Sequence, residues 1–124
     1  MGREWMNEPF DRDLIRGSLD LMVLSVLSQQ PQYGYMIQQK ISQASDGRVP
    51  IQAGTLYPLL HKLESEKLIR AKWDDSSGRK RKWYELTAKG RKRLRSGAEQ
   101  WQQFANCVLG LLNPKKNLPG TSEA

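Results

Sequence analysis

The sequence predicts a mainly helical fold with one small β-hairpin. Leucines at positions 56, 59, 60 and 63 recur with the i, i+3, i+4, i+7 spacing of one helix face. Residues 68–73 largely alternate in polarity, as a half-buried strand does, and residues 79–86 return after a turn at 74–78. A second apolar helical repeat runs from residue 88 to 112. We therefore expect short helices, then a hairpin, then one long helix.

Two further helices are expected before the leucine repeat. Residues 13–29 are apolar around most of a helix circumference, which predicts burial on more than one side, the second side against another subunit. Residues 36–45 form a shorter helix that ends at an Asp-Gly turn. Thr55 is expected to cap the third helix, which would place Pro58 in its first turn, where a missing N–H breaks no hydrogen bond.

Positive charge is concentrated in the second part of the chain. The protein has 20 Lys and Arg against 13 Asp and Glu, a net charge of +7, and the whole excess lies after residue 70. Residues 79–95 alone hold nine basic residues and one acid. Such runs are commonly solvated surface. Here the run begins at a predicted turn after an exposed helix face, so an anionic partner such as DNA is the better hypothesis.

Composition excludes several other classes of function. One cysteine and one histidine cannot form an intramolecular disulfide or a closed zinc site, and we expect no metal and no cofactor. His61 has no accompanying nucleophile or carboxylate in the sequence pattern, so enzymatic activity is not expected. The longest apolar region, residues 19–27, is far shorter than the roughly 20 residues of a membrane span. These features predict a soluble, cytoplasmic protein.

Three short helices followed by a hairpin is the order of a winged helix-turn-helix, which we predict for residues 13–87 after an N-terminal arm at 1–12. In that fold the third helix enters the major groove and the hairpin, or wing, reaches the phosphate backbone. The N-terminal end of the third helix also favours a phosphate. The expected DNA-binding residues are Gly54, Thr55, Tyr57, His61, Lys62, Arg79, Lys80, Arg81 and Lys82.

The last helix, capped by Thr87, predicts a homodimer. Its roughly 25 residues span nearly 40 Å, and a small domain cannot cover so long an apolar stripe. The expected dimerisation residues are Leu94, Ala98, Trp101, Phe104, Ala105, Val108, Leu111 and Leu112. Trp101 is most simply an aromatic of this stripe, but with Gly97 it could also line an interfacial site for a planar, apolar effector. Residues 113–124 are expected to be a flexible tail.

Several stretches, in the same order, closely resemble the PadR-type transcriptional regulators: Gly17–Leu27, Tyr33–Tyr35, Gly54–Leu60, Leu63–Ile69 and Gly78–Gly90. The resemblance extends from about residue 14 to 112, and is greatest to the branch with a single C-terminal helix. It implies a homodimeric winged-helix protein, usually a repressor that binds a near-palindromic operator and is often released by a small effector. It places the recognition helix at 54–66, the wing at 73–84 and the dimerisation helix at 88–112. Lys67 stands where many relatives have glycine.

One alternative from another class stays open. The basic run could belong to a protein-interaction module that binds an acidic protein or RNA. Duplex RNA fits poorly, because its major groove is too narrow for side chains on a helix to read. Competition between duplex RNA and duplex DNA would separate the two functions.

Overall fold

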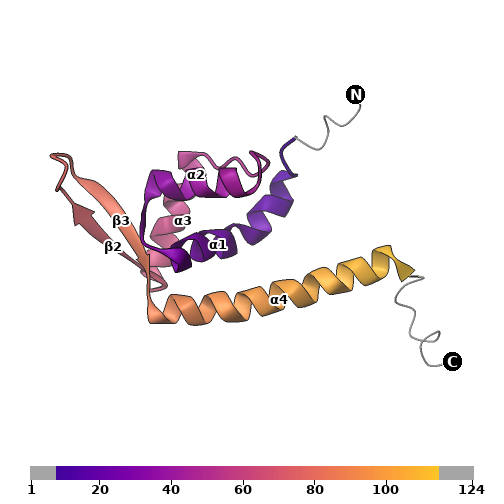
Figure 1. The fold of residues 1–124 in the computed structure, drawn as a ribbon. Helices are drawn as coiled ribbons and strands as arrows, with labels where there is room; N and C mark the ends of the chain where they lie inside the picture. Colours follow the sequence, from indigo (N-terminus) through magenta and orange to yellow (C-terminus); the bar gives the residue numbers. More distant parts are fainter. Residues whose placement is uncertain (1–7, 115–124) are drawn as a thin grey trace. The chain divides into compact units, whose positions relative to one another are not determined.

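The computed structural model describes residues 8–114. Its elements are α1 (Arg12–Gln29), β1 (Gln32–Tyr33), α2 (Gly34–Ala44), α3 (Ala53–Ser65), β2 (Ile69–Asp74), β3 (Arg81–Leu86) and α4 (Ala88–Leu112) (Figure 1). The chain forms two units, one ending at Leu94 and the other beginning at Arg95, and α4 contributes to both. The predicted order of three helices, a hairpin and a long helix is confirmed.

The hairpin belongs to a three-stranded antiparallel sheet of order β1-β3-β2. Strands β2 and β3 pair from Ile69 opposite Leu86 to Asp74 opposite Arg81, and β1 places Tyr33 opposite Trp83. The sequence predicts the hairpin but not β1, because a two-residue strand is too short to show an alternation. Through β1, the segment between α1 and α2 is tied to the edge of the wing.

The hydrophobic core lies between the three short helices and the base of the sheet. In Figure 1 these helices gather on one side of the hairpin, which projects beyond them. Tyr84 and Leu86 of β3 are buried and belong to this core. The buried apolar side chains are Leu19, Val23, Leu24, Leu27, Ile37, Ile41, Val49, Ile51, Leu56, Leu60, Leu63, Leu68, Ile69, Tyr84 and Leu86.

Helix α1 buries one apolar side in this core and leaves part of another exposed. Leu14, on the other side, is 64 % exposed, and Leu21 is half-buried. Residues 8–10 of the expected arm contact their own chain, since the Phe10 N–H donates to the Arg48 carbonyl at 2.9 Å and the Arg48 guanidinium stacks on the Phe10 ring. The rest of the expected arm, residues 1–7, and the tail from 115 onward lie outside the described residues.

The expected cap of α3 at Thr55 is wrong. The helix begins at Ala53, and the N–H groups of Thr55 and Leu56 already donate to the Gln52 carbonyl at 2.9 Å. The backbone is therefore helical before Thr55, and Thr55 is an exposed residue of the first turn. Pro58 consequently lies inside the helix, where its missing N–H removes the bond that would reach the Gly54 carbonyl.

Helix α3 ends in a left-handed residue. The N–H groups of Lys67 and Leu68 donate to the carbonyls of Glu64 and Leu63, both at 3.0 Å, which is the Schellman pattern. Lys67 has φ of 66°. Glycine adopts this conformation without the steric penalty that a Cβ brings.

The junction between α3, the sheet and α4 is tightly packed around Thr87 and Gly90. Thr87 Oγ1 accepts from the Gly90 N–H at 3.0 Å, which confirms the predicted cap of α4, and donates to the Lys67 carbonyl at 2.7 Å. A Cβ at Gly90 would lie only 2.1 Å from the Leu68 carbonyl oxygen. Gly90 is thus the residue that lets α4 start against the turn after α3, and not merely a weak point in the helix.

Replacing Lys67 with glycine should stabilise the protein by about 0.5–1 kcal/mol, because glycine relieves the left-handed strain at this position. Urea unfolding of the two proteins measures the difference. Lys92→Gly is a matched control, since it makes the same exchange inside α4 and should destabilise by about 1 kcal/mol. A Lys67→Gly protein less stable than the parent would contradict the strain at residue 67.

Candidate nucleic-acid interface

The buried leucines of α3 determine which side chains this helix presents outward. Leu56, Leu60 and Leu63 have no exposed surface. Because side chains repeat at about 100° per residue, the opposite face must point to solvent. The predicted contact residues Gly54, Thr55, Tyr57, His61 and Lys62 are all exposed. The first turn of α3 contains no acidic residue, so the positive end of the helix dipole is available to an anion.

Tyr57 has a structural contact in addition to its exposed edge. It is 37 % exposed. A Cβ on Gly34, the first residue of α2, would lie 2.7 Å from the Tyr57 hydroxyl oxygen and 2.8 Å from its ring. The absence of a side chain at Gly34 therefore lets the phenol of Tyr57 rest on the start of α2, which restricts the orientation of its ring.

Lys62 lies at the margin of the exposed face. Its Nζ is 3.2 Å from Asp20 Oδ2 of α1. Both side chains are substantially exposed, so this ion pair contributes little to stability. It does hold the ammonium group toward α1, and a contact with DNA would require Lys62 to exchange Asp20 for a phosphate or a base edge.

The four basic residues of the wing have different surroundings. Arg79 and Lys80 are exposed at the tip. The Arg81 guanidinium lies 5.0 Å from the centre of the Tyr33 ring. Lys82 Nζ lies 3.9 Å from Glu64 Oε1 of α3 and 5.6 Å from the centre of the Trp73 ring. Lys80 Nζ lies 5.8 Å from the centre of the same ring. Arg81 and Lys82 therefore lie against the body of the domain, Lys80 lies near Trp73, and Arg79 is exposed at the tip.

Glu85 pairs with two cations of β2. Its Oε2 is 2.7 Å from Arg70 Nη2 and 3.5 Å from Lys72 Nζ. The hydrogen bond from Arg70 lowers the pKa of Glu85 from its ordinary value. Glu85 is thus engaged by the cations of β2, and the acids that precede Arg79 and Lys80 in the same hairpin are Asp74 and Asp75.

An aromatic cluster attaches the wing to the segment before α2. The Tyr33 hydroxyl donates to Asp74 Oδ2 at 2.5 Å. The Tyr33 ring stacks on Tyr35 with 6.1 Å between centroids and meets Trp83 edge-on at 5.1 Å. The bond from Tyr33, with a further one from the Ser76 N–H, lowers the pKa of Asp74 to about 2. The same bond raises the pKa of Tyr33.

Sequence reasoning missed Tyr33, Tyr35, Asp74 and Trp73 as residues of this region. The Tyr33-Gly34-Tyr35 step is visible in the sequence, but its contact with the wing depends on the pairing of β1 with β3. Trp73 is predicted on the inward side of β2, yet it is largely exposed because the core ends before it. Its place beside Lys80 and Lys82 is a result of the hairpin register.

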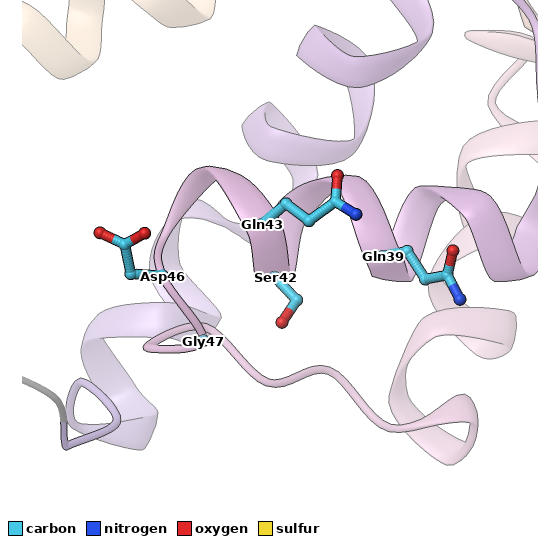
Figure 2. A pocket seen from close by; sticks show the side chains of 5 residues that line it. All are labelled: Gln39, Ser42, Gln43, Asp46 and Gly47. Atoms are coloured by element: carbon cyan, nitrogen blue, oxygen red, sulfur yellow. The ribbon is translucent and has the colours of Figure 1, made fainter.

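Two shallow depressions lie on the described surface. One is lined by Tyr35, Arg79, Lys80 and Arg81, which makes it strongly basic. The other lies at the end of α2 and the Asp46-Gly47 turn (Figure 2). In Figure 2 the amides of Gln39 and Gln43 and the Asp46 carboxylate point in different directions, so they do not converge on a common ligand atom. Only the basic depression has the chemistry of an anion site.

Nothing in residues 8–114 suggests a metal site or a membrane span. No group of three or more His, Cys, Asp or Glu side chains in these residues could hold a metal ion. None of the described helices is both long and apolar enough to cross a membrane.

The apolar stripe of α4 is divided between the two units. Leu94 packs against the core of the first unit. Beyond it Trp101 is 48 % exposed, Phe104 67 % and Leu111 82 %. Ala98, Val108 and Leu112 are also exposed, whereas Gly97 and Ala105 are half-buried. The side chains expected at a dimer interface therefore remain accessible in the single chain, apart from Leu94.

Comparison with known proteins agrees with this architecture. Residues 23–96 match the Transcriptional regulator PadR-like family. A PadR family transcriptional regulator from Eggerthella lenta is 38 % identical, with a TM-score of 0.74 over 81 % of this chain and 86 % of that one. A PadR-like transcriptional regulator from Bacillus cereus is 33 % identical, with a TM-score of 0.70 over 81 % and 96 %. A transcriptional regulator of Mycobacterium tuberculosis is 29 % identical over 80 % of this chain and 90 % of its own.

The fold and the basic wing thus define a winged helix-turn-helix protein that binds DNA and regulates transcription, and not an enzyme. The chain belongs to the PadR-like family of transcriptional regulators. This confirms the resemblance on which the sequence-based prediction of function rests.

Replacing Tyr33 with phenylalanine should raise the pKa of Asp74 from about 2 toward its ordinary 3.8, because the strongest hydrogen bond to the carboxylate is removed. Carbon-13 NMR titration of the carboxyl group measures this. The pKa of Asp74 is lower in the folded protein than in the unfolded chain. The hydrogen bond therefore stabilises the fold above pH 3.8, and this stabilisation is lost as the pH falls through about 2. Tyr35→Phe is the control and should leave Asp74 unchanged. An unchanged pKa of Asp74 in the Tyr33→Phe variant would refute the hydrogen bond between the two side chains.

Proposed function

We propose that this regulator is a homodimeric repressor that reads a near-palindromic operator. The observation that carries the proposal is the combination of an outward α3 face bearing Tyr57 and His61 with a wing that exposes the cations Arg79 and Lys80 at its tip. In this proposal α3 lies in the major groove, and Arg79, Lys80, Arg81 and Lys82 contact phosphates. Gly54 and Thr55 approach a phosphate through the start of α3.

The individual residues have different roles in the proposed complex. Tyr57, His61 and Lys62 are positioned to distinguish base pairs, since they extend from the exposed face of the helix. Arg79 and Arg81 supply charge neutralisation that does not depend on sequence. Arg81 is already held by Tyr33 and Tyr35, so it reaches the backbone with less loss of side-chain entropy than Arg79.

Dimerisation is proposed through the exposed stripe of α4. Two copies of α4 would bury Trp101, Phe104, Val108 and Leu111, whose exposed fractions in the single chain range from 38 % to 82 %. Ala98, Ala105 and Leu112 complete the stripe at helical spacing. A two-fold dimer would present two α3 helices, which suits an operator with two related half-sites. The exposed Leu14 side of α1 is a further surface for the second copy.

An effector is proposed to act at the same interface. Gly97 and Trp101 lie one turn apart on α4, so two Trp101 indoles across a two-fold axis would offer flat surfaces to a planar, apolar compound. Binding there would favour one spacing of the two α3 helices over another, and so alter operator affinity. In the family this release is the expected route to derepression.

The DNA proposal is tested by fluorescence anisotropy with DNA from upstream of the protein's own gene and with a scrambled duplex. The upstream DNA should bind tighter by a factor on the order of 10³, with a steep salt dependence. Arg79→Ala should reduce the salt slope by about 0.9, because one phosphate contact is lost, and leave sequence preference unchanged. Tyr57→Phe or Lys62→Ala should instead change the preference between operators.

Arg16→Ala serves as the control for charge, since Arg16 lies on α1 and pairs with Asp13. It should leave the slope unchanged. Equal, weak binding of both duplexes would contradict sequence-specific regulation at this DNA, and tighter binding of duplex RNA would favour the interaction module. Planar aromatic compounds added to the operator complex should lower the anisotropy if they release the protein.

The dimer proposal is tested by a charge in the α4 stripe. Val108→Glu should convert the dimer to a monomer, because a carboxylate at the centre of an apolar interface would lose its hydration. Sedimentation equilibrium measures the mass. Gln103→Glu adds the same charge to the opposite side of α4 and should remain dimeric. A dimeric Val108→Glu protein would place the interface elsewhere.

A further inference from the structure

Trp73 is an exposed aromatic side chain that neither the core nor the predicted contact set uses. Its exposed fraction is 63 %, the highest of any aromatic side chain in residues 8–94. A single exposed apolar residue is ordinary on a protein surface. Trp73 differs because of the charges that the hairpin places around it.

Two ammonium groups lie beside the Trp73 ring. Lys80 Nζ is 5.8 Å and Lys82 Nζ is 5.6 Å from the ring centre. Lys82 lies directly opposite Trp73 in the antiparallel register, so their side chains share one face of the hairpin. Cation–π attraction to the indole keeps both ammonium groups close to the ring.

The register also determines which way this group faces. The pairs Ala71 with Tyr84 and Ile69 with Leu86 are on the same face as Trp73 and Lys82. That face covers the core and packs against α3, and Lys82 Nζ lies 3.9 Å from Glu64 Oε1 of α3. The face of the hairpin that carries Trp73 is therefore the face turned toward α3. The opposite face carries Trp83 and the Tyr33 cluster.

A flat apolar ring with two cations close to it is complementary to a sugar-phosphate backbone, in which apolar sugar faces alternate with anionic phosphates. Duplex DNA meets both parts of this surface. An acidic protein segment would satisfy the two ammonium groups but leave the indole without a matching contact. The charge at the wing tip, uncompensated by Glu85, favours the same polyanion.

We propose that Trp73, Lys80 and Lys82 form one DNA contact next to the base pairs read by α3. The indole packs against a deoxyribose, and the two ammonium groups neutralise the phosphates on either side of it. This inference rests on the proposed function and adds to it an apolar contact of the wing. The contact stabilises the wing on the DNA through burial of apolar surface as well as through neutralisation of charge.

The first test incorporates 5-fluorotryptophan into the full-length protein and assigns the fluorine resonances with single Trp→Phe variants. On addition of operator duplex, the Trp73 resonance should shift, and its sensitivity to replacing H₂O with D₂O should fall as the indole leaves water. The Trp83 resonance is the internal control, because Trp83 is on the other face of the hairpin. A Trp73 resonance that stays unchanged and solvent-sensitive in the complex would overturn the inference.

The second test measures, for single variants, the affinity for operator DNA and the slope of its dependence on salt concentration. Trp73→Ala should weaken operator binding about tenfold with an unchanged slope, since it removes contact area but no charge. Lys80→Ala should instead reduce the slope by about 0.9. If Trp73→Ala reduces the slope as much as Lys80→Ala does, the indole only positions the lysines and the inference is wrong.

The outcomes separate this inference from the proposed function. Thermal unfolding should show that Trp73→Ala is folded, because the residue is largely exposed. Parent protein that prefers the operator, together with an unaffected Trp73→Ala variant, would reject the indole contact and leave the repressor intact. Parent protein with no operator preference would reject the proposed function, and the inference with it.

Discussion

The burial of one face of α3 is the constraint on which the rest of the structure depends. Leu56, Leu60 and Leu63 are entirely inside, and burying each leucine contributes about 1.5–3 kcal/mol. Rotating the helix to bury Tyr57 or His61 instead would expose these leucines. The hydrophobic effect therefore determines the face that α3 presents to solvent, which is the face proposed to contact DNA.

The wing depends on a second set of contacts. The Tyr33–Asp74 hydrogen bond and the aromatic packing of Tyr33 attach the hairpin to the segment that begins α2. The Gly90–Leu68 approach and the Thr87 cap position the other end of the sheet against α4. A basic loop on an otherwise flexible hairpin would lose conformational entropy on binding. Attachment at both ends reduces that loss.

The net charge of +7 does not show which basic residues have acidic partners. Glu85 engages Arg70 and Lys72, Asp20 engages Lys62, and Glu64 lies near Lys82. The exposed pairs contribute little to folding. The hairpin, residues 69–86, still carries six basic residues against three acidic ones, and such an excess attracts a polyanion.

The sequence by itself determined the order of elements, the inward side of α3, the basic hairpin and the apolar stripe of α4. Each of these follows from the local periodicity of apolar residues or from the local density of charge. Only the tertiary structure decided the start of α3 before Thr55, the pairing of β1, the bond between Tyr33 and Asp74, and the lysine neighbours of Trp73. These depend on contacts between residues distant in the chain, in which strand register and packing choose the partners. Local pattern holds no information about such pairs. The exposed face of α3 was therefore predictable, while the contacts that support it were not.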